Sequence, residues 1–117
     1  MYTEREILLA VLRKEIGEVI VDQRRRKGLT QVKLAAMCGM SKRLLVGIEN
    51  GYASYSMDKY LLMSIALDMG IEDMLCKAAA NLTANKDSKE RLEARMQQER
   101  KTMQRHLGSE NKIFPVK

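Results

Sequence analysis

Two adjacent cations, Lys42 and Arg43, directly follow Ser41 in the stretch from Gln31 to Gly51. A helical run begins at Ser41, whose hydroxyl can accept a hydrogen bond from an amide of the first turn. Positive side chains in a first helical turn oppose the helix dipole, so their presence there indicates a negatively charged partner outside the protein. The chemistry that we expect of this segment is therefore anion binding.

The distribution of charge along the chain supports the same expectation. The 117 residues have a net charge of +6; residues 1–75 carry 11 basic and 10 acidic side chains, and residues 76–117 carry 10 and 5. No acidic residue lies between Arg24 and Ile48. The cations of this acid-free segment are Arg24, Arg25, Arg26, Lys27, Lys33, Lys42 and Arg43. Such segregation predicts one positive face, which is typical of a site for a polyanion.

Two short helices joined by a tight turn must position these cations. The segment 31–37 has helical apolar spacing, and Thr30 can cap its first turn. Residues 38–40 interrupt the spacing, and Gly39 there supplies the positive φ that a short interhelical turn needs. Asn50 and Gly51 then end the second helix. The pattern predicts a helix, a turn and a helix.

Further helical patterns flank this pair and predict an all-α fold. Thr3 and Glu6 form a capping box, and helical character extends from there to Lys27. Gly17, in the middle, predicts either a bend or the junction of two abutting helices. Helices are also expected over 57–67 and 71–75, and the alanine-rich segment 77–85 can extend the last of them. We predict a five-helix bundle over residues 16–75, an amphipathic helical extension over 1–15, and a basic arm and tail over 76–117 that contain a charged helix.

Residues 16–75 resemble the helix-turn-helix domain of the XRE family, which includes Cro and the phage repressors. In the motif the matching residues are Gln31, Ala35, Gly39, Ser41, Ile48, Glu49, Asn50 and Gly51, and around it they are Ile20, Arg24, Leu67 and Leu75. The alignment has no gaps and covers about half the chain. The resemblance implies a regulator of transcription that binds specific sequences of double-stranded DNA. A repressor that acts as a homodimer on an inverted-repeat operator is the expected form.

The resemblance also implies roles for individual residues, because the second motif helix of such proteins lies in the major groove. Lys42 and Arg43 are expected to donate to guanine O6 and N7, and Val46 to touch a thymine methyl group. The expected phosphate contacts are Gln31, Lys33, Ser41, Asn50, Tyr52 and Arg26, of which Lys33 and Arg26 are chosen by charge. Arg24 and Glu49 are expected to form a structural ion pair.

Two departures from the family pattern lie close to the motif. Tyr55 replaces a proline that is common after it, which leaves the geometry of that loop open. Gly47 replaces a residue of the second helix that is usually polar or basic. We therefore expect one contact fewer and a more flexible helix at this position.

Two segments outside the motif are candidates for a homodimer interface. Residues 4–12 carry a broad apolar patch, which predicts either a local core with the C-terminal segment or a dimer interface. Residues 76–107 include a charged helix whose apolar stripe is thin and is interrupted by Glu99; its members are Leu92, Met96, Met103 and Leu107. This helix fits a solvated arm, a coiled coil or a surface for a protein partner. The tail residues 113–116 are a further apolar segment that could dock on the protein.

Other functions find little support in the sequence. His106 is the single histidine, and there is no glycine-rich phosphate loop and no nucleophile with a base nearby, so we expect neither an enzyme nor a cofactor or metal. Cys38 and Cys76 predict two small buried residues or, as an alternative, a redox switch. The apolar runs are too short to cross a membrane, which predicts a cytoplasmic protein. An antitoxin or adaptor that has kept the fold for protein interaction is the alternative to the regulator.

Overall fold

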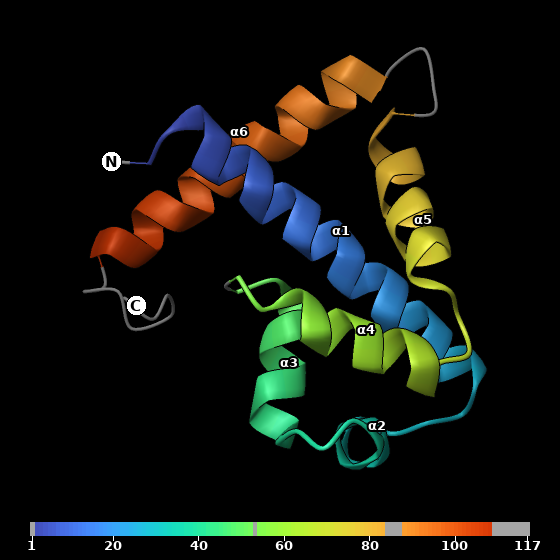
Figure 1. The fold of residues 1–117 in the computed structure, drawn as a ribbon. Helices are drawn as coiled ribbons and strands as arrows, with labels where there is room; N and C mark the ends of the chain where they lie inside the picture. The colour runs from blue at the N-terminus through green and yellow to red at the C-terminus, as the bar shows by residue number, and fades with distance from the viewer. Residues whose placement is uncertain (1, 53, 84–87, 109–117) are drawn as a thin grey trace.

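A computed structural model describes residues 2–52, 54–83 and 88–108. It shows α1 (Glu4–Arg26), α2 (Gln31–Met37), α3 (Lys42–Asn50), α4 (Met57–Ala66), α5 (Ile71–Thr83) and α6 (Ser88–Gly108). The described residues contain no strand, so the predicted all-α class is confirmed. Figure 1 shows α2 and α3 at one end of the molecule and α6 crossing α1 at the other.

The first helix is continuous over nearly the whole range that the sequence predicted. The capping box is present, since Thr3 N donates to Glu6 Oε1 at 2.8 Å and Glu6 N donates to Thr3 Oγ1 at 3.1 Å. From there α1 continues for 23 residues, so Gly17 does not separate two helices. Gly17 instead marks the place where α1 meets α3. A Cβ at this position would lie 2.1 Å from the carbonyl oxygen of Glu49, so only glycine permits the approach.

We expect Gly17→Ala to lower the free energy of unfolding by about 1–3 kcal/mol, the usual cost of overpacking a core. The added methyl group presses on the backbone of α3, and this outweighs the gain of about 1 kcal/mol in helix propensity. Urea denaturation measures the change. Gly70→Ala is the matched control, because its Cβ meets the mobile end of the Glu72 side chain rather than backbone. Equal midpoints for Gly17→Ala and the wild type would contradict this account of the helix contact.

The main core lies between the first five helices and is built from aliphatic side chains and methionine. Its fully buried members include Ile20, Leu34, Leu45, Ile48, Met63, Leu67 and Met74. The residues predicted to cap and to end α2 and α3 do so in the structure. Thr30 Oγ1 accepts from Lys33 N, and Ser41 Oγ accepts from Leu44 N, each at 3.0 Å. Gly39 and Gly51 both have a φ of +67°.

A second, smaller core joins the N-terminal part of α1 to α6. Ile7 and Ala10 of α1 pack against Met103 of α6, with Met96 beside them. This is the local core that the sequence allowed for residues 4–12, and the interpretation of α6 as a solvated helix is wrong. The domain boundaries predicted at residues 15 and 76 fall inside α1 and α5, and α5 includes residues 77–83 of the alanine-rich segment.

Glu99 does not interrupt the contact between α6 and α1 but takes part in it. Its carboxylate is buried and accepts from Lys14 Nζ at 2.6 Å. Ion pairs between Arg95 and Glu15 and between Arg100 and Glu4 also join the two helices. A buried charge paired in this way can replace an apolar residue in a packed stripe.

The two cysteines differ in their surroundings. Cys38 is buried, and burial raises the pKa of its thiol. Cys76 is exposed, so the prediction of two buried cysteines is wrong for this residue. Neither forms a disulfide. The tail residues 113–116 lie outside the described part of the chain, and none of the described helices is long and apolar enough to span a membrane.

Candidate nucleic-acid interface

The N-terminal turn of α3 presents two cations to solvent. Lys42 and Arg43 are its first residues after the cap, and both are exposed. Their direction is fixed by the other side of the helix, where Leu45 and Ile48 are buried in the main core. Val46 is half-buried one turn further along the helix. The packing of α3 therefore holds the two charged side chains at the surface.

The structure divides the seven cations of the acid-free segment into paired and unpaired ones. Arg24 pairs with Glu49, Arg26 with Asp22 at 3.0 Å, and Lys27 with Asp68. In the described part of the chain no ion-pair partner contacts Arg25, Lys33, Lys42 or Arg43. The positive charge of the motif is thus concentrated on residues that an external anion can reach.

Arg26 remains available in spite of its partner. Its side chain is 65% exposed and that of Asp22 is 63% exposed. An exposed pair of this kind contributes between zero and about 1 kcal/mol, so a phosphate can replace the Asp22 carboxylate.

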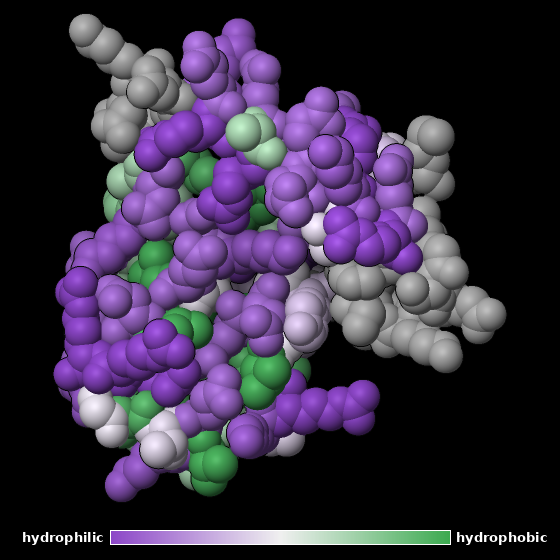
Figure 2. Space-filling model, turned by 180° about the vertical axis from the view of Figure 1, so that it is seen from behind, coloured by the Kyte–Doolittle hydropathy of each residue, from purple (hydrophilic) through white to green (hydrophobic). Residues whose placement is uncertain are grey.

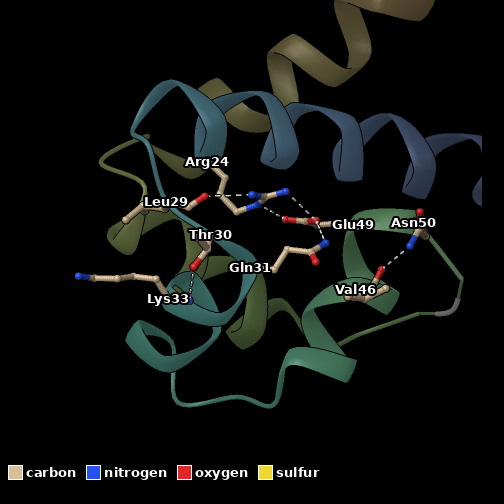
Figure 3. Close-up of polar contacts among 8 residues, drawn as sticks. All are labelled: Arg24, Leu29, Thr30, Gln31, Lys33, Val46, Glu49 and Asn50. Carbon is tan, nitrogen blue, oxygen red and sulfur yellow. Dashed lines mark hydrogen bonds and ion pairs between the residues drawn. The ribbon is translucent and has the colours of Figure 1, made fainter.

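A buried polar network joins α1, α2 and α3 behind this surface (Figure 3). Arg24 Nε donates to Glu49 Oε2 at 2.7 Å, and a second guanidinium nitrogen reaches Glu49 Oε1 at 3.4 Å. Arg24 also donates to the carbonyl oxygen of Leu29 at 3.0 Å. Gln31 Nε2 donates to Glu49 Oε1 at 2.9 Å. The carboxylate of Glu49 therefore fixes the mutual orientation of the three helices.

This network assigns Gln31 a contact that sequence reasoning missed. The sequence placed the Gln31 side chain on a phosphate, whereas the structure places its amide nitrogen on Glu49. The amide has a second hydrogen to donate, so a phosphate contact remains a prediction. The partner of Gln31 lies 18 residues further along the chain, and no local pattern pairs the two.

The other expected phosphate contacts surround the start of α2 and the two ends of α3. Asn50 is exposed, and its Nδ2 donates to the carbonyl oxygen of Val46 at 2.9 Å (Figure 3). Lys33 in α2 and Tyr52 after α3 are also exposed. Ser41 Oγ is occupied as an acceptor by the helix cap but still has a proton to donate. These side chains therefore lie on α2, at both ends of α3 and in the segment that follows α3.

The two departures from the family pattern, Gly47 and Tyr55, lie against each other, and the tyrosine fills the space that the glycine leaves. Gly47 is buried, and a Cβ there would lie 2.4 Å from the hydroxyl oxygen of Tyr55. Position 47 is therefore covered by Tyr55 and does not present a side chain to a partner. Arg13 of α1 donates to Ser54 Oγ at 3.4 Å and connects the same loop to the first helix.

No set of three or more His, Cys, Asp or Glu side chains within the described ranges is arranged to hold a metal ion. The interface is composed of cations, amides and hydroxyl groups, which are donors suited to phosphate oxygens and to the acceptors of base edges.

Comparison with known proteins locates this architecture in one part of the chain. The family model described as helix-turn-helix matches residues 20–74, from the last two turns of α1 to the first turn of α5. This region includes the buried network and all the side chains discussed above except Arg13. No curated protein matches the chain.

Proposed function

Since residues 20–74 belong to the XRE helix-turn-helix family of DNA-binding regulators, we propose that this protein is a repressor that binds an inverted-repeat operator as a homodimer. In this proposal α3 enters the major groove. Arg43 and Lys42 donate to guanine acceptors, and Val46 contacts a thymine methyl group. Gln31, Lys33, Ser41, Asn50, Tyr52 and Arg26 bind phosphates and set the position of the domain on the duplex.

One observation carries the proposal: Lys42 and Arg43 are exposed, have no ion-pair partner among the described residues, and start a helix whose other side is fixed in the core. A surface that bound only proteins would not need two adjacent cations opposed to the helix dipole. The alternative of an adaptor depended on a free C-terminal arm. The described helix of that arm is engaged within the protein, because α6 packs on α1 through Met103 and the Lys14–Glu99 pair, and this makes the alternative less favoured.

The decisive experiment is selection of operators from random double-stranded DNA, followed by a mobility-shift titration at two salt concentrations. We expect a selected site with two inverted half-sites about one helical turn apart. Binding should weaken with salt by about 0.9 decades per decade of salt for each phosphate contacted. A failure to enrich any sequence, together with weak binding that depends only on salt, would exclude the proposed function.

A further inference from the structure

The fourth helix leaves an apolar face uncovered. Its exposed positions are Met57, Asp58, Leu61, Leu62 and Ile65, and Ile65 is the most open of them at 74%. Residues four apart lie on the same side of a helix, so Met57, Leu61 and Ile65 form a row, with Leu62 next to it. We call these four apolar residues the α4 strip. The other side of α4, with Met63 and Ser64, is buried.

Exposed apolar side chains are concentrated in this strip. Four of the nine large apolar residues exposed in the described part of the chain lie in the ten residues of α4. The face of the molecule turned away from the viewer in Figure 1 is mostly hydrophilic (Figure 2). A contiguous apolar patch on one face marks an interaction surface, whereas scattered single residues do not.

Residues 4–12, one of the two segments expected to form dimers, are largely covered within the protein, although Leu9 is exposed. Ile7, Ala10 and Val11 of the segment 4–12 are buried within the protein, the first two against α6. Of the exposed apolar residues outside α4, Val32 and Met37 lie on α2, at the end that we assign to DNA. The others are Leu9 on α1, Tyr52 after α3 and Leu75 on α5. Of the helices that the structure describes, α4 therefore exposes the most large apolar side chains, which makes the α4 strip the best surface for a second copy.

We propose that the α4 strip is the homodimer interface, and that α4 packs antiparallel against α4 of a second copy of this chain. This inference rests on the proposed function, because that function requires a homodimer. A two-fold contact requires a surface that is complementary to itself. The strip meets this requirement, because it is apolar along its length, and Asp58 is the one exposed charged residue within α4.

The charge of Asp58 selects the antiparallel arrangement. A two-fold axis near Leu61 and Leu62 places Asp58 of one copy opposite Ile65 of the other. The two carboxylates are then separated by about 10 Å along the helix, from a rise of about 1.5 Å per residue. A parallel arrangement would bring the like charges together, which is unfavourable.

The position of α4 relative to α3 fits an inverted repeat. In Figure 1, α4 runs across the view, α2 lies below it, and α3 descends from its left end toward the lower left. A two-fold axis that runs from top to bottom of this view, beside α4, reverses the direction of α4 in the second copy. It also leaves both α3 helices at the same end of the dimer. Both can then face one duplex, as two half-sites of opposite orientation require.

The interface is small, since ten residues of helix are about 15 Å long. It therefore falls below the roughly 800 Å² per partner of a standard interface. We expect a weak dimer in solution that becomes stable when two half-sites hold both copies on one duplex.

Ile65→Glu tests the interface, with Gln104→Glu on α6 as the matched control that adds the same charge at an exposed helical position. Sedimentation should show a monomer–dimer equilibrium for the wild type and the control, and a monomer for Ile65→Glu. Binding of Ile65→Glu to the inverted repeat should be at least tenfold weaker, while binding to a single half-site should change less than twofold. Thermal unfolding checks that the exposed substitution leaves the fold intact.

Cross-linking gives a second measurement that does not involve DNA. In a Cys76→Ser background, oxidation of Leu61→Cys should give a covalent dimer, because Leu61 lies next to the proposed axis. Gln104→Cys in the same background should give no covalent dimer.

The possible outcomes separate the two proposals. Dimers that survive Ile65→Glu, or a wild type that is monomeric both free and on the inverted repeat, would overturn the α4 interface. A wild type that dimerises and cross-links through Leu61→Cys but binds no selected DNA would support the interface and overturn the proposed function.

Discussion

Replacing Lys42 and Arg43 together with alanine is expected to weaken binding to the selected operator by at least about a hundredfold. Each good contact to a guanine contributes about 1–3 kcal/mol of discrimination, and the two side chains have no other partner among the described residues. Both are exposed, so the free energy of unfolding should be nearly unchanged. Fluorescence anisotropy measures the affinity for the operator and for a scrambled duplex, and the ratio of these two affinities gives the specificity.

The matched control replaces two exposed cations on other helices with alanine, namely Lys77 on α5 and Lys101 on α6. It should weaken binding to both duplexes by a similar small factor through net charge alone. If this control lost as much affinity for the operator as the α3 variant, or if the α3 variant kept its preference for the operator, the assignment of base contacts would be wrong.

The second large effect concerns stability. Glu49→Ala is expected to lower the free energy of unfolding by about 3–5 kcal/mol, since removal of one partner leaves a buried charge uncompensated. The side chain of Arg24 is only 10% exposed, and it would lose both of its contacts to the carboxylate. Gln31 would lose its acceptor as well. Urea denaturation measures the loss, and Glu49→Gln, which keeps acceptor capacity without the charge, should lie between the alanine variant and the wild type.

Glu93→Ala on α6 is the control, because it removes an exposed carboxylate that makes no ion pair with a described residue. Its unfolding midpoint should match that of the wild type. An unchanged melting temperature for Glu49→Ala, combined with weaker DNA binding, would show that Glu49 acts in recognition rather than in the fold.

Local features of the motif were predictable from the sequence. The hydroxyl groups of Thr30 and Ser41 cap their helices by accepting a hydrogen bond from the backbone amide three residues further along the chain. Gly39 and Gly51 adopt the positive φ expected of them. These interactions join residues close together in the chain, so the order of residue types is sufficient to identify them. The same holds for the helix-turn-helix itself, whose residue spacing is matched over 20–74.

Two misinterpreted residues show where such reasoning fails. Gly17 predicted a bend or a junction, but its role is to admit the backbone of Glu49, 32 positions further along the chain. Glu99 interrupted an apolar stripe, but it pairs with Lys14 across 85 positions. Neither partner is close enough in sequence to produce a pattern.

The sequence alone therefore determined the helices, their caps, the motif and the cations that it exposes. The tertiary structure decided which of those cations remain unpaired, why position 47 is glycine beneath Tyr55, that α6 covers the apolar patch of α1, and that α4 retains an exposed apolar strip. The physical reason is the range of the interactions. Helix propensity and capping act within about four residues, whereas burial and ion pairing depend on which distant segments the fold brings into contact.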